Sequence, residues 1–397
     1  MDLHWLKPLL GHKPPFVTVF LDATRAEAAG ETEAADRWKA ARRSLERDGA
    51  PAPVLDEIAD LVAVPTGVRG PHGRVVIADA GGVVLDRVVS EPPAQTVATV
   101  GPVPDLVPAV RAADEAVELL VVSVDRTGAD LVWKSAGGAR PGAGVEPERE
   151  TVEGGHDDVH KVRENGLSRR GQTRAEDSWE RNAEEVAAFL DKRVAERTPE
   201  LVVLTGDVRA VALVCERVGQ QVRELVVEVP GGARGPGAKP DAFAQRVHAA
   251  VDELRARRRR AVLDRFDEAL GRGDGAVTSL PDVVEVLRRG QVAELVLGEG
   301  MLASLQEREV LVGAQPLELA TTQADLDTLG VGEARRYPAV VALVRAALGQ
   351  DAGVTFAPEE AELPDGVGAL LRWSDGSTPA EQLLTQSADA RRVRAIT

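Results

Sequence analysis

Residues 165–186 read NGLSRRGQTRAEDSWERNAEEV, and the stretch changes in character halfway along. Its first part is typical of a loop, and arginines surround the pair Gly171-Gln172. An apolar stripe begins a few residues further on. Its members recur at the spacing of one helix face: Trp179, Ala183, Val186, Leu190 and Val194. The pattern predicts a basic loop that carries Arg-Gly-Gln and leads into a long amphipathic helix.

The segments that flank this helix alternate between strand and helix patterns. A hairpin is predicted before it, turning at Thr127-Gly128. After it the sequence predicts a buried strand over 198–207, a helix over 208–218, a strand over 222–230 and a long helix over 241–270. Such alternation indicates a sheet with helices packed on it.

The two ends of the chain give similar patterns. Before residue 114 the sequence predicts, in order, a strand over 15–22, helices over 31–48 and 54–64, a hairpin over 73–89 and a helix over 106–117. After residue 270, Ser279 is the predicted N-cap of a helix with Pro281 just inside it, and three strands and a further helix follow. The predicted class is α/β (mixed α+β) in three domains, each a sheet packed with helices. These are an N-terminal α/β domain (1–113), a middle domain with the Arg-Gly-Gln loop (114–262), and a C-terminal αβα sandwich with a polar tail (263–397).

Composition narrows the classes of protein to be considered. The chain has 397 residues and no apolar run near 20, so no membrane span is predicted. Its N-terminus lacks the pattern of a secretory signal, and its single cysteine, Cys215, has the setting of a buried core thiol. We therefore expect a cytoplasmic protein without a membrane partner.

The net charge of −16 argues against a protein that coats nucleic acid broadly. Two short stretches carry a net positive charge instead. Residues 161–174 carry five basic side chains against Glu164, and residues 251–260 carry five arginines against Asp252 and Glu253. An acidic body with two basic spots fits a protein that touches RNA at chosen points, although either spot could also be an ordinary solvated surface.

Two other motifs do not predict a cofactor or a metal. The glycine-rich stretch 231–239 follows a strand, but it lacks the Gly-Lys-Ser/Thr ending of a phosphate-binding loop. His156 and His160 have the spacing of a helical metal pair. However, Gly154-Gly155 oppose a helix there, and no third ligand is near in sequence. We expect neither a metal nor a cofactor.

The order of parts over residues 115–300 resembles the class-I release factors of archaea and eukaryotes, and pelota with its bacterial relatives. In this chain the parts are a hairpin, a basic Gly-Gln loop, a long helix, a strand ending in LTGD (204–207), a helix, a strand and a long helix. Arg265-Phe266 and the stretch 275–297 match the family's third domain. The resemblance implies a middle-domain loop that enters the peptidyl-transferase centre of the ribosome.

This chain departs from the family pattern at two places. Arg170 stands where the family has the first glycine of Gly-Gly-Gln, and the Asn-Ile-Lys-Ser tetrapeptide used in stop-codon recognition is absent from the sequence. The resemblance then implies a factor that occupies the A site of the 70S ribosome without reading stop codons, like the Balon-type hibernation factors, with elongation factor Tu as a candidate partner. It implies contacts to ribosomal RNA from Lys161, Arg163, Arg169, Arg170 and Arg174.

Three functions stay open. The first is the hibernation or stress factor, which is favoured because Arg170 replaces a glycine and no decoding motif is visible. The second is a codon-independent peptidyl-tRNA hydrolase in ribosome rescue, in which Gln172 orients the water and Gly171 supplies the loop geometry. The third is an unrelated metabolic α/β enzyme.

Overall fold

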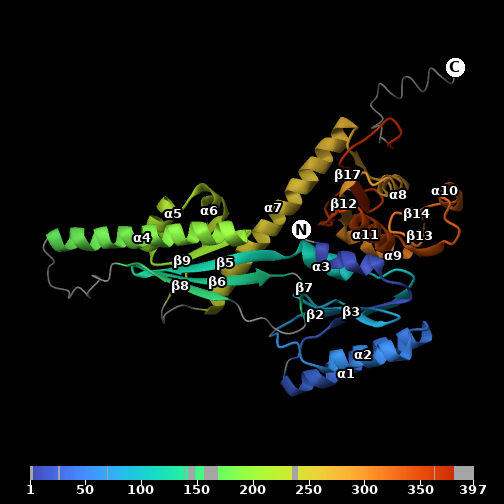
Figure 1. Ribbon diagram of the computed structural model, residues 1–397, viewed down its shortest axis with the longest axis horizontal. Coiled ribbons are helices and arrows are strands. Elements are labelled where there is room, and N and C mark those ends of the chain that lie inside the picture. The colour runs from blue at the N-terminus through green and yellow to red at the C-terminus, as the bar shows by residue number, and fades with distance from the viewer. Residues whose placement is uncertain are drawn as a thin grey trace. The chain divides into compact units, whose positions relative to one another are not determined.

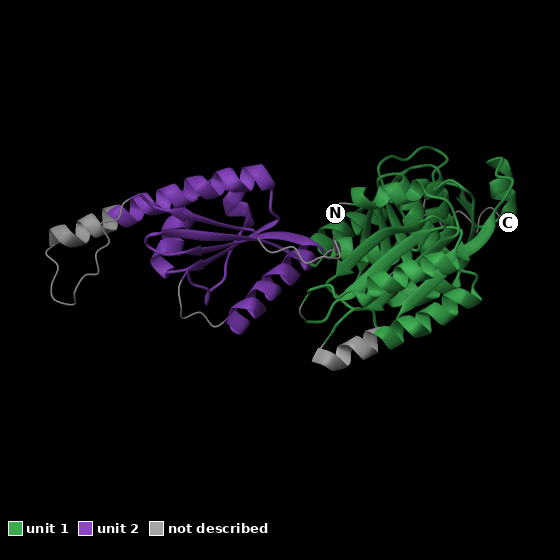
Figure 2. Ribbon diagram, turned by 60° about the horizontal axis from the view of Figure 1, so that its bottom comes forward, with its two compact units in different colours: residues 1–115, 137–144, 258–397 green, residues 116–136, 145–257 purple. Residues whose placement is uncertain are grey.

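The computed structural model describes residues 3–25, 27–68, 70–137, 139–141, 148–155, 169–234, 240–361 and 363–379; the side chains of 27–34, 139–141 and 169–177 are not described. The chain forms two compact units (Figure 2). Unit 1 comprises residues 1–115, 137–144 and 258–397, and unit 2 comprises residues 116–136 and 145–257. The division into three domains stays a prediction.

The N-terminal part of unit 1 is built on an antiparallel sheet in the order β4-β1-β2-β3-β7 (Figure 1). Its strands are β1 (Phe16–Asp22), β2 (Gly73–Asp79), β3 (Gly82–Val89), β4 (Val97–Gly101) and β7 (Ala139–Pro141). The helices are η1 (His4–Gly11), α1 (Glu27–Arg47), α2 (Ala52–Ala63) and α3 (Val107–Asp114). Alternate residues divide between the two faces of the sheet. Val76 and Ala78 of β2 join the core under α1 and α2, and Val75 and Ile77 join a core shared with α3 and the C-terminal elements.

The C-terminal part of unit 1 has a four-stranded sheet in the order β11-β17-β12-β16. Its strands are β11 (Ala276–Val277), β12 (Val292–Gly298), β16 (Gly353–Ala357) and β17 (Val367–Leu371). The helices are α8 (Leu280–Arg288), η2 (Glu299–Met301), α9 (Leu302–Glu307), α10 (Gln323–Thr328) and α11 (Ala339–Gly349). The predicted cap of α8 is confirmed, because the Ser279 hydroxyl accepts a hydrogen bond from the amide of Asp282 at 3.2 Å.

A second, smaller sheet in this part was not predicted. It has the order β14-β13-β15 and is formed by β13 (Glu309–Val312), β14 (Leu319–Ala320) and β15 (Arg335–Pro338). Strands of two to four residues are too short to show a reliable alternation, so the sequence pattern gave no signal for them.

Unit 2 is a five-stranded sheet with helices on both faces. The sheet has the order β10-β9-β5-β6-β8. Its strands are β5 (Val117–Val124), β6 (Gly128–Ala136), β8 (Arg149–Glu153), β9 (Leu201–Gly206) and β10 (Val226–Glu228). The helices are α4 (Arg169–Arg197), α5 (Val208–Arg217), α6 (Gln220–Leu225) and α7 (Pro240–Arg272), which continues into unit 1. Along β5, Leu120 and Val122 face α4 and α5, while Leu119 and Val121 face α7.

Both predicted hairpins are confirmed, as β2–β3 and β5–β6, and β9 is a buried parallel strand as predicted. Two other predictions were wrong. Residues 222–225, predicted as the start of a strand, belong to α6 instead, because Arg and Glu there favour a helix and the valine pair comes only with β10.

The second wrong prediction concerns the Arg-Gly-Gln loop. Helix α4 begins at Arg169, so Arg170, Gly171 and Gln172 lie in its first turn instead of in a loop before it. Arginine and glutamine are good helix formers, and one glycine costs a helix only about 1 kcal/mol relative to alanine.

Among the residues that the structure describes, no helix combines the length and the apolar character needed to cross a membrane.

Candidate nucleic-acid interface

The turn between β5 and β6 lies beside the end of β8 in unit 2, where the amide of Gly154 donates to the carbonyl of Thr127 at 2.8 Å. One oxygen of Asp125 accepts hydrogen bonds from the amide of Thr127 at 2.8 Å, its hydroxyl at 2.6 Å and the amide of Gly128 at 3.0 Å. Gly128 has to be a glycine, because a β-carbon there would lie 2.1 Å from the carbonyl oxygen of Val152. The turn is therefore held rigidly beside the end of β8.

Arg234 fastens this turn to the segment that leads into α7. Its guanidinium contacts Asp125 at 2.9 Å, Asp130 at 3.2 Å and Glu153 at 2.6 Å, while its side chain is only 12% exposed. Partial burial alone would raise the pKa of Asp125. The hydrogen bonds from Thr127 and Arg234 outweigh burial and hold that pKa below its usual value. We call Arg234 and its three carboxylate partners the Arg234 hub.

The packed part of α4 is anchored next to the hub. The guanidinium of Arg126 lies 4.2 Å from the ring centre of Trp179, which is the geometry of a cation–π contact, and its Nε lies 3.5 Å from Asp207. Asn182, 2% exposed, donates from its amide to the carbonyl of Arg126 at 2.9 Å. A β-carbon at Gly154 would collide with this amide. The segment that follows β8 therefore leaves the sheet in close contact with α4.

Two polar atoms at this anchor are buried without a hydrogen-bond partner among the described residues. They are the indole Nε1 of Trp179 and the Oδ1 of Asn182. Buried polar groups are usually satisfied, so these two atoms mark the anchor as an unusual place in the described part of unit 2.

Helix α5 begins beside the anchor. Asp207 caps it, because one carboxylate oxygen accepts from the amides of Arg209 at 3.0 Å and Ala210 at 3.2 Å. The next residue, Val208, is 83% exposed, and Arg209 is exposed as well. This end of unit 2 thus combines a stacked arginine, an exposed arginine and an exposed apolar side chain.

The structure locates only part of the predicted contact set. Arg169, Arg170, Gly171, Gln172 and Arg174 belong to the first turns of α4, but their side chains are not described. Lys161 and Arg163 lie outside the described residues, as do His156 and His160. The described residues contain no group of three or more His, Cys, Asp or Glu side chains placed to hold a metal.

The second basic spot, on α7, is less uniform than its sequence indicates. Arg255 pairs with Asp252 at 3.1 Å, and Arg259 acts on the buried carboxyl of Asp114. Arg257 and Arg260 are exposed. Burial and the neighbouring Glu228 raise the pKa of the Cys215 thiol to about 11, which disfavours its thiolate form.

Sequence reasoning missed Arg126, Trp179 and Arg234 as residues of the site. Trp179 was assigned to the apolar stripe of α4, and Arg126 lies in the predicted turn, but nothing in the sequence pairs them. Arg234 stands 109 positions from Asp125, so only the assembled sheet brings the two together.

Comparison with known proteins identifies the middle of the chain. Residues 118–272 match the family described as "Bacterial archaeo-eukaryotic release factor family 2". The uncharacterized protein Rv2629 of Mycobacterium tuberculosis strain H37Rv is 27% identical over 375 residues, which are 94% of this chain and 96% of that protein. The uncharacterized protein MT2704 of strain CDC 1551 matches to the same extent.

Solved structures that resemble the chain include pelota from Archaeoglobus fulgidus. It is 13% identical, with a TM-score of 0.34 over 77% of this chain and 86% of that one. An archaeal translation termination factor, aRF1, is 16% identical, with a TM-score of 0.24 over 93% and 96% of the two chains. At these TM-scores the likenesses carry no weight of their own. What the comparisons show is that residues 118–272 of this chain are similar to the bacterial family 2 of the archaeo-eukaryotic release factors.

Proposed function

We propose that this chain is a ribosome-associated factor that occupies the A site without reading stop codons, and that it acts as a hibernation or stress factor. The observation that carries the proposal is the match of residues 118–272 to a release-factor family. The same residues hold the arginine cluster at the start of α4. The absent decoding tetrapeptide supports a role without codon recognition.

The chemistry of the first turn of α4 suits a phosphate backbone. Arg169, Arg170 and Arg174 supply positive charge. The first amides of a helix have no partner within it, and the positive end of the helix dipole adds to the attraction for anions. The Arg126–Trp179 stack contacts α4 beyond its first turns, and the Arg234 hub fixes the neighbouring residue Asp125; in the proposal they hold the helix in a fixed direction while its first turn contacts ribosomal RNA.

The proposal is tested by co-sedimentation with 70S ribosomes over a range of salt concentrations. Replacing Arg169→Glu and Arg170→Glu reverses the local charge. We expect binding to fall at least tenfold and the salt dependence to become shallower, because each lost phosphate contact lowers the slope by about 0.7 to 0.9. The matched control is Arg181→Glu with Lys192→Glu, which makes the same charge change on exposed positions of the same helix.

An equal loss of ribosome binding in both double variants would mean that only the overall charge matters. Unchanged binding of the Arg169→Glu, Arg170→Glu variant would overturn the assignment of these arginines as RNA contacts. Ribosomes programmed with sense or stop codons supply a further arm. Affinities within about a factor of ten, or ~1.4 kcal/mol, are expected, and a clear preference for stop codons contradicts the proposal.

A second candidate function is peptidyl-tRNA hydrolysis, favoured by the retention of Gly171 and Gln172. A hydrolase must orient water and stabilise a developing oxyanion, and the loss of one such donor typically costs a factor of about 100 to 1000 in rate. Release of labelled peptide is compared for wild type, Gln172→Ala and Arg170→Gly. The hibernation proposal expects slow release by wild type and no effect of Gln172→Ala. Fast release that depends on Gln172 makes the protein a rescue hydrolase instead.

Arg170→Gly is the informative variant in that comparison. It restores Gly-Gly-Gln and weakens the first turn of α4 by about 1 kcal/mol, which favours a loop there. A gain of release in this variant alone would show that the helical first turn is what keeps Gln172 inactive.

A further inference from the structure

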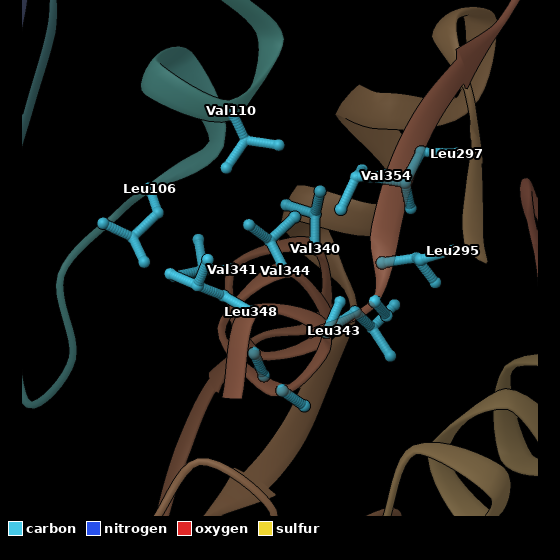
Figure 3. Packing of buried hydrophobic residues seen from close by; sticks show 14 of the residues in the cluster. Leu106, Val110, Leu295, Leu297, Val340, Val341, Leu343, Val344, Leu348 and Val354 are labelled. Atoms are coloured by element: carbon cyan, nitrogen blue, oxygen red, sulfur yellow. The ribbon is translucent and has the colours of Figure 1, made fainter. Parts of the chain in front are cut away.

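Helix α3 joins the N-terminal part of unit 1 to its C-terminal part. Leu106 and Val110 pack against side chains of α11 and β16 in one core cluster (Figure 3). Their labelled neighbours are Val340, Val341, Val344, Leu348 and Val354, all buried. We call this packing the α3 contact. Any separation of the two parts would expose these apolar side chains, so the contact helps to hold the two parts of unit 1 together.

A buried carboxyl group lies at the start of α3. Asp105 is 5% exposed; its amide donates to the hydroxyl of Thr18 at 3.1 Å, and its carboxylate accepts from the amide of Val107 at 3.1 Å. The titratable group that faces it is the phenol of Tyr337 on β15, whose pKa burial raises to about 12. A phenol that stays neutral offers Asp105 no positive charge.

A second carboxyl group lies at the other end of the same helix. Asp114 accepts a hydrogen bond from the backbone amide of Phe356 on β16, the edge strand of the sheet. Such an edge presents amides that no neighbouring strand can pair. The charged groups that act on Asp114 are Arg259 of α7 and the N-terminal amine, which lower its pKa, and Glu294 of β12, which raises it.

The charged groups around Asp114 form hydrogen bonds and ion pairs with other side chains. Glu294 accepts from the hydroxyl of Thr355 at 2.7 Å and is influenced by Arg265 of α7. The neighbouring guanidinium on α3, that of Arg111, is tied to Glu299 at 2.6 Å and lies 3.8 Å from Glu115. The positive charge near this carboxyl is thus shared among several acidic groups.

We propose that the α3 contact is a proton-dependent latch, tight when the carboxyl groups of Asp105 and Asp114 are protonated and weaker when both are ionised. A protonated carboxyl can remain buried at little cost, whereas a buried carboxylate without a dedicated cation destabilises the contact that buries it. The latch depends on unit 1 alone and does not rest on the ribosome-binding function.

The titration of the two groups sets the direction and range of the effect. Burial raises the pKa of Asp105 and of Asp114 to about 6, from a usual value of 3.8. The folded contact therefore binds protons more tightly than the separated parts do, and it gains stability as the pH falls through 6, levelling off near 4. Between pH 7.5 and 5.5 each group favours the closed contact by about fourfold, or roughly tenfold or more together.

The latch is tested by hydrogen exchange of the full chain, with protection factors for peptides of α3 and β16 measured at pH 7.5, 6.5 and 5.5. Wild type should gain about tenfold protection across this range. Asp105→Asn with Asp114→Asn should remove the dependence, because an amide mimics the protonated carboxyl. Asp36→Asn with Asp60→Asn is the matched control at two exposed positions, and it should keep the wild-type response.

Equal pH responses in wild type and the Asp105/Asp114 double variant would overturn the latch. If the double variant does not fold, the carboxyl carbons of aspartate in the wild-type chain can be titrated directly by NMR. Two buried groups with midpoints near pH 6 support the latch, and midpoints near 4 for every aspartate exclude it.

Discussion

The Arg234 hub of unit 2 and the α3 contact of unit 1 both contain carboxyl groups, but they place them in opposite environments. At the hub, one arginine meets three carboxylates, and the contact forms through charge. At the α3 contact, apolar packing supplies the stability; Asp105 is buried there, and the partly buried Asp114 is influenced by the charge of Arg259. The same chemical group is thus stabilised as an anion in one unit and disfavoured as an anion in the other.

The two arrangements should respond to acid in opposite directions. The pKa of Asp125 at the hub is lowered, so the hub's stability is present above the usual pKa of aspartate and is lost as the pH falls below it. The pKa values of Asp105 and Asp114 are raised, so the α3 contact gains stability on mild acidification. Three variants test this contrast between the two regions.

The largest effect is expected at the apolar contact. Leu106 is fully buried between α3 and α11, so Leu106→Ala removes its packing and leaves a cavity (Figure 3). We expect a loss of about 2 to 5 kcal/mol in the unfolding free energy of unit 1, measured by urea denaturation with hydrogen exchange of unit 1 peptides. The exposed Val64→Ala should change little. A loss of unfolding free energy smaller than the loss caused by Arg234→Met would contradict the ranking of the two regions.

A smaller effect is expected at the hub. Arg234→Met leaves three carboxylates without their cation, yet these are 41%, 37% and 61% exposed and can be hydrated. We therefore expect about 2 kcal/mol, less than the 3 to 5 typical of a fully buried pair. Arg234→Lys should be intermediate, because it keeps the charge but loses the fork geometry. Arg181→Met is the exposed control on α4, and a loss as large there would mean that the hub adds nothing specific.

The smallest effect concerns the sign of the pH response at the hub. Wild-type peptides of β5 and β6 should lose protection as the pH falls from about 5 to 3, because protonation of Asp125 weakens its bonds to Thr127 and Arg234. Asp125→Asn should flatten this slope without affecting the rise at α3. A hairpin that gains protection in acid would contradict the contrast between the two regions.

The sequence predicted the elements that depend on local signals. The stripe of α4, the two hairpins and the cap at Ser279 all follow from spacings of a few residues, and each is confirmed. The short strands of the small sheet and helix α6 were missed, because two to six residues hold too little pattern. The Arg-Gly-Gln stretch was identified by its residues but was wrongly placed in a loop, because a single glycine does not end a helix.

In the candidate site, too, some residues could be predicted from the sequence and others could not. The arginine cluster and Gln172 could be selected from the sequence, since charge and composition are visible there. The sequence could not predict the anchor of Arg126 and Trp179, the Arg234 hub or the carboxyl groups at the two ends of α3. Arg234, which follows β10, meets Asp125 at the end of β5 because β10, β9 and β5 lie side by side in one sheet. Asp114 meets Phe356 only because α3 packs against β16.

By itself, then, the sequence determined most of the longer helices and strands, and it identified the basic stretch before and at the start of α4. The tertiary structure alone decided which charges are paired and which are buried without a dedicated partner. The physical reason is range: periodicity and capping act over a few residues, whereas the electrostatic environment of a side chain is set by groups more than a hundred positions away.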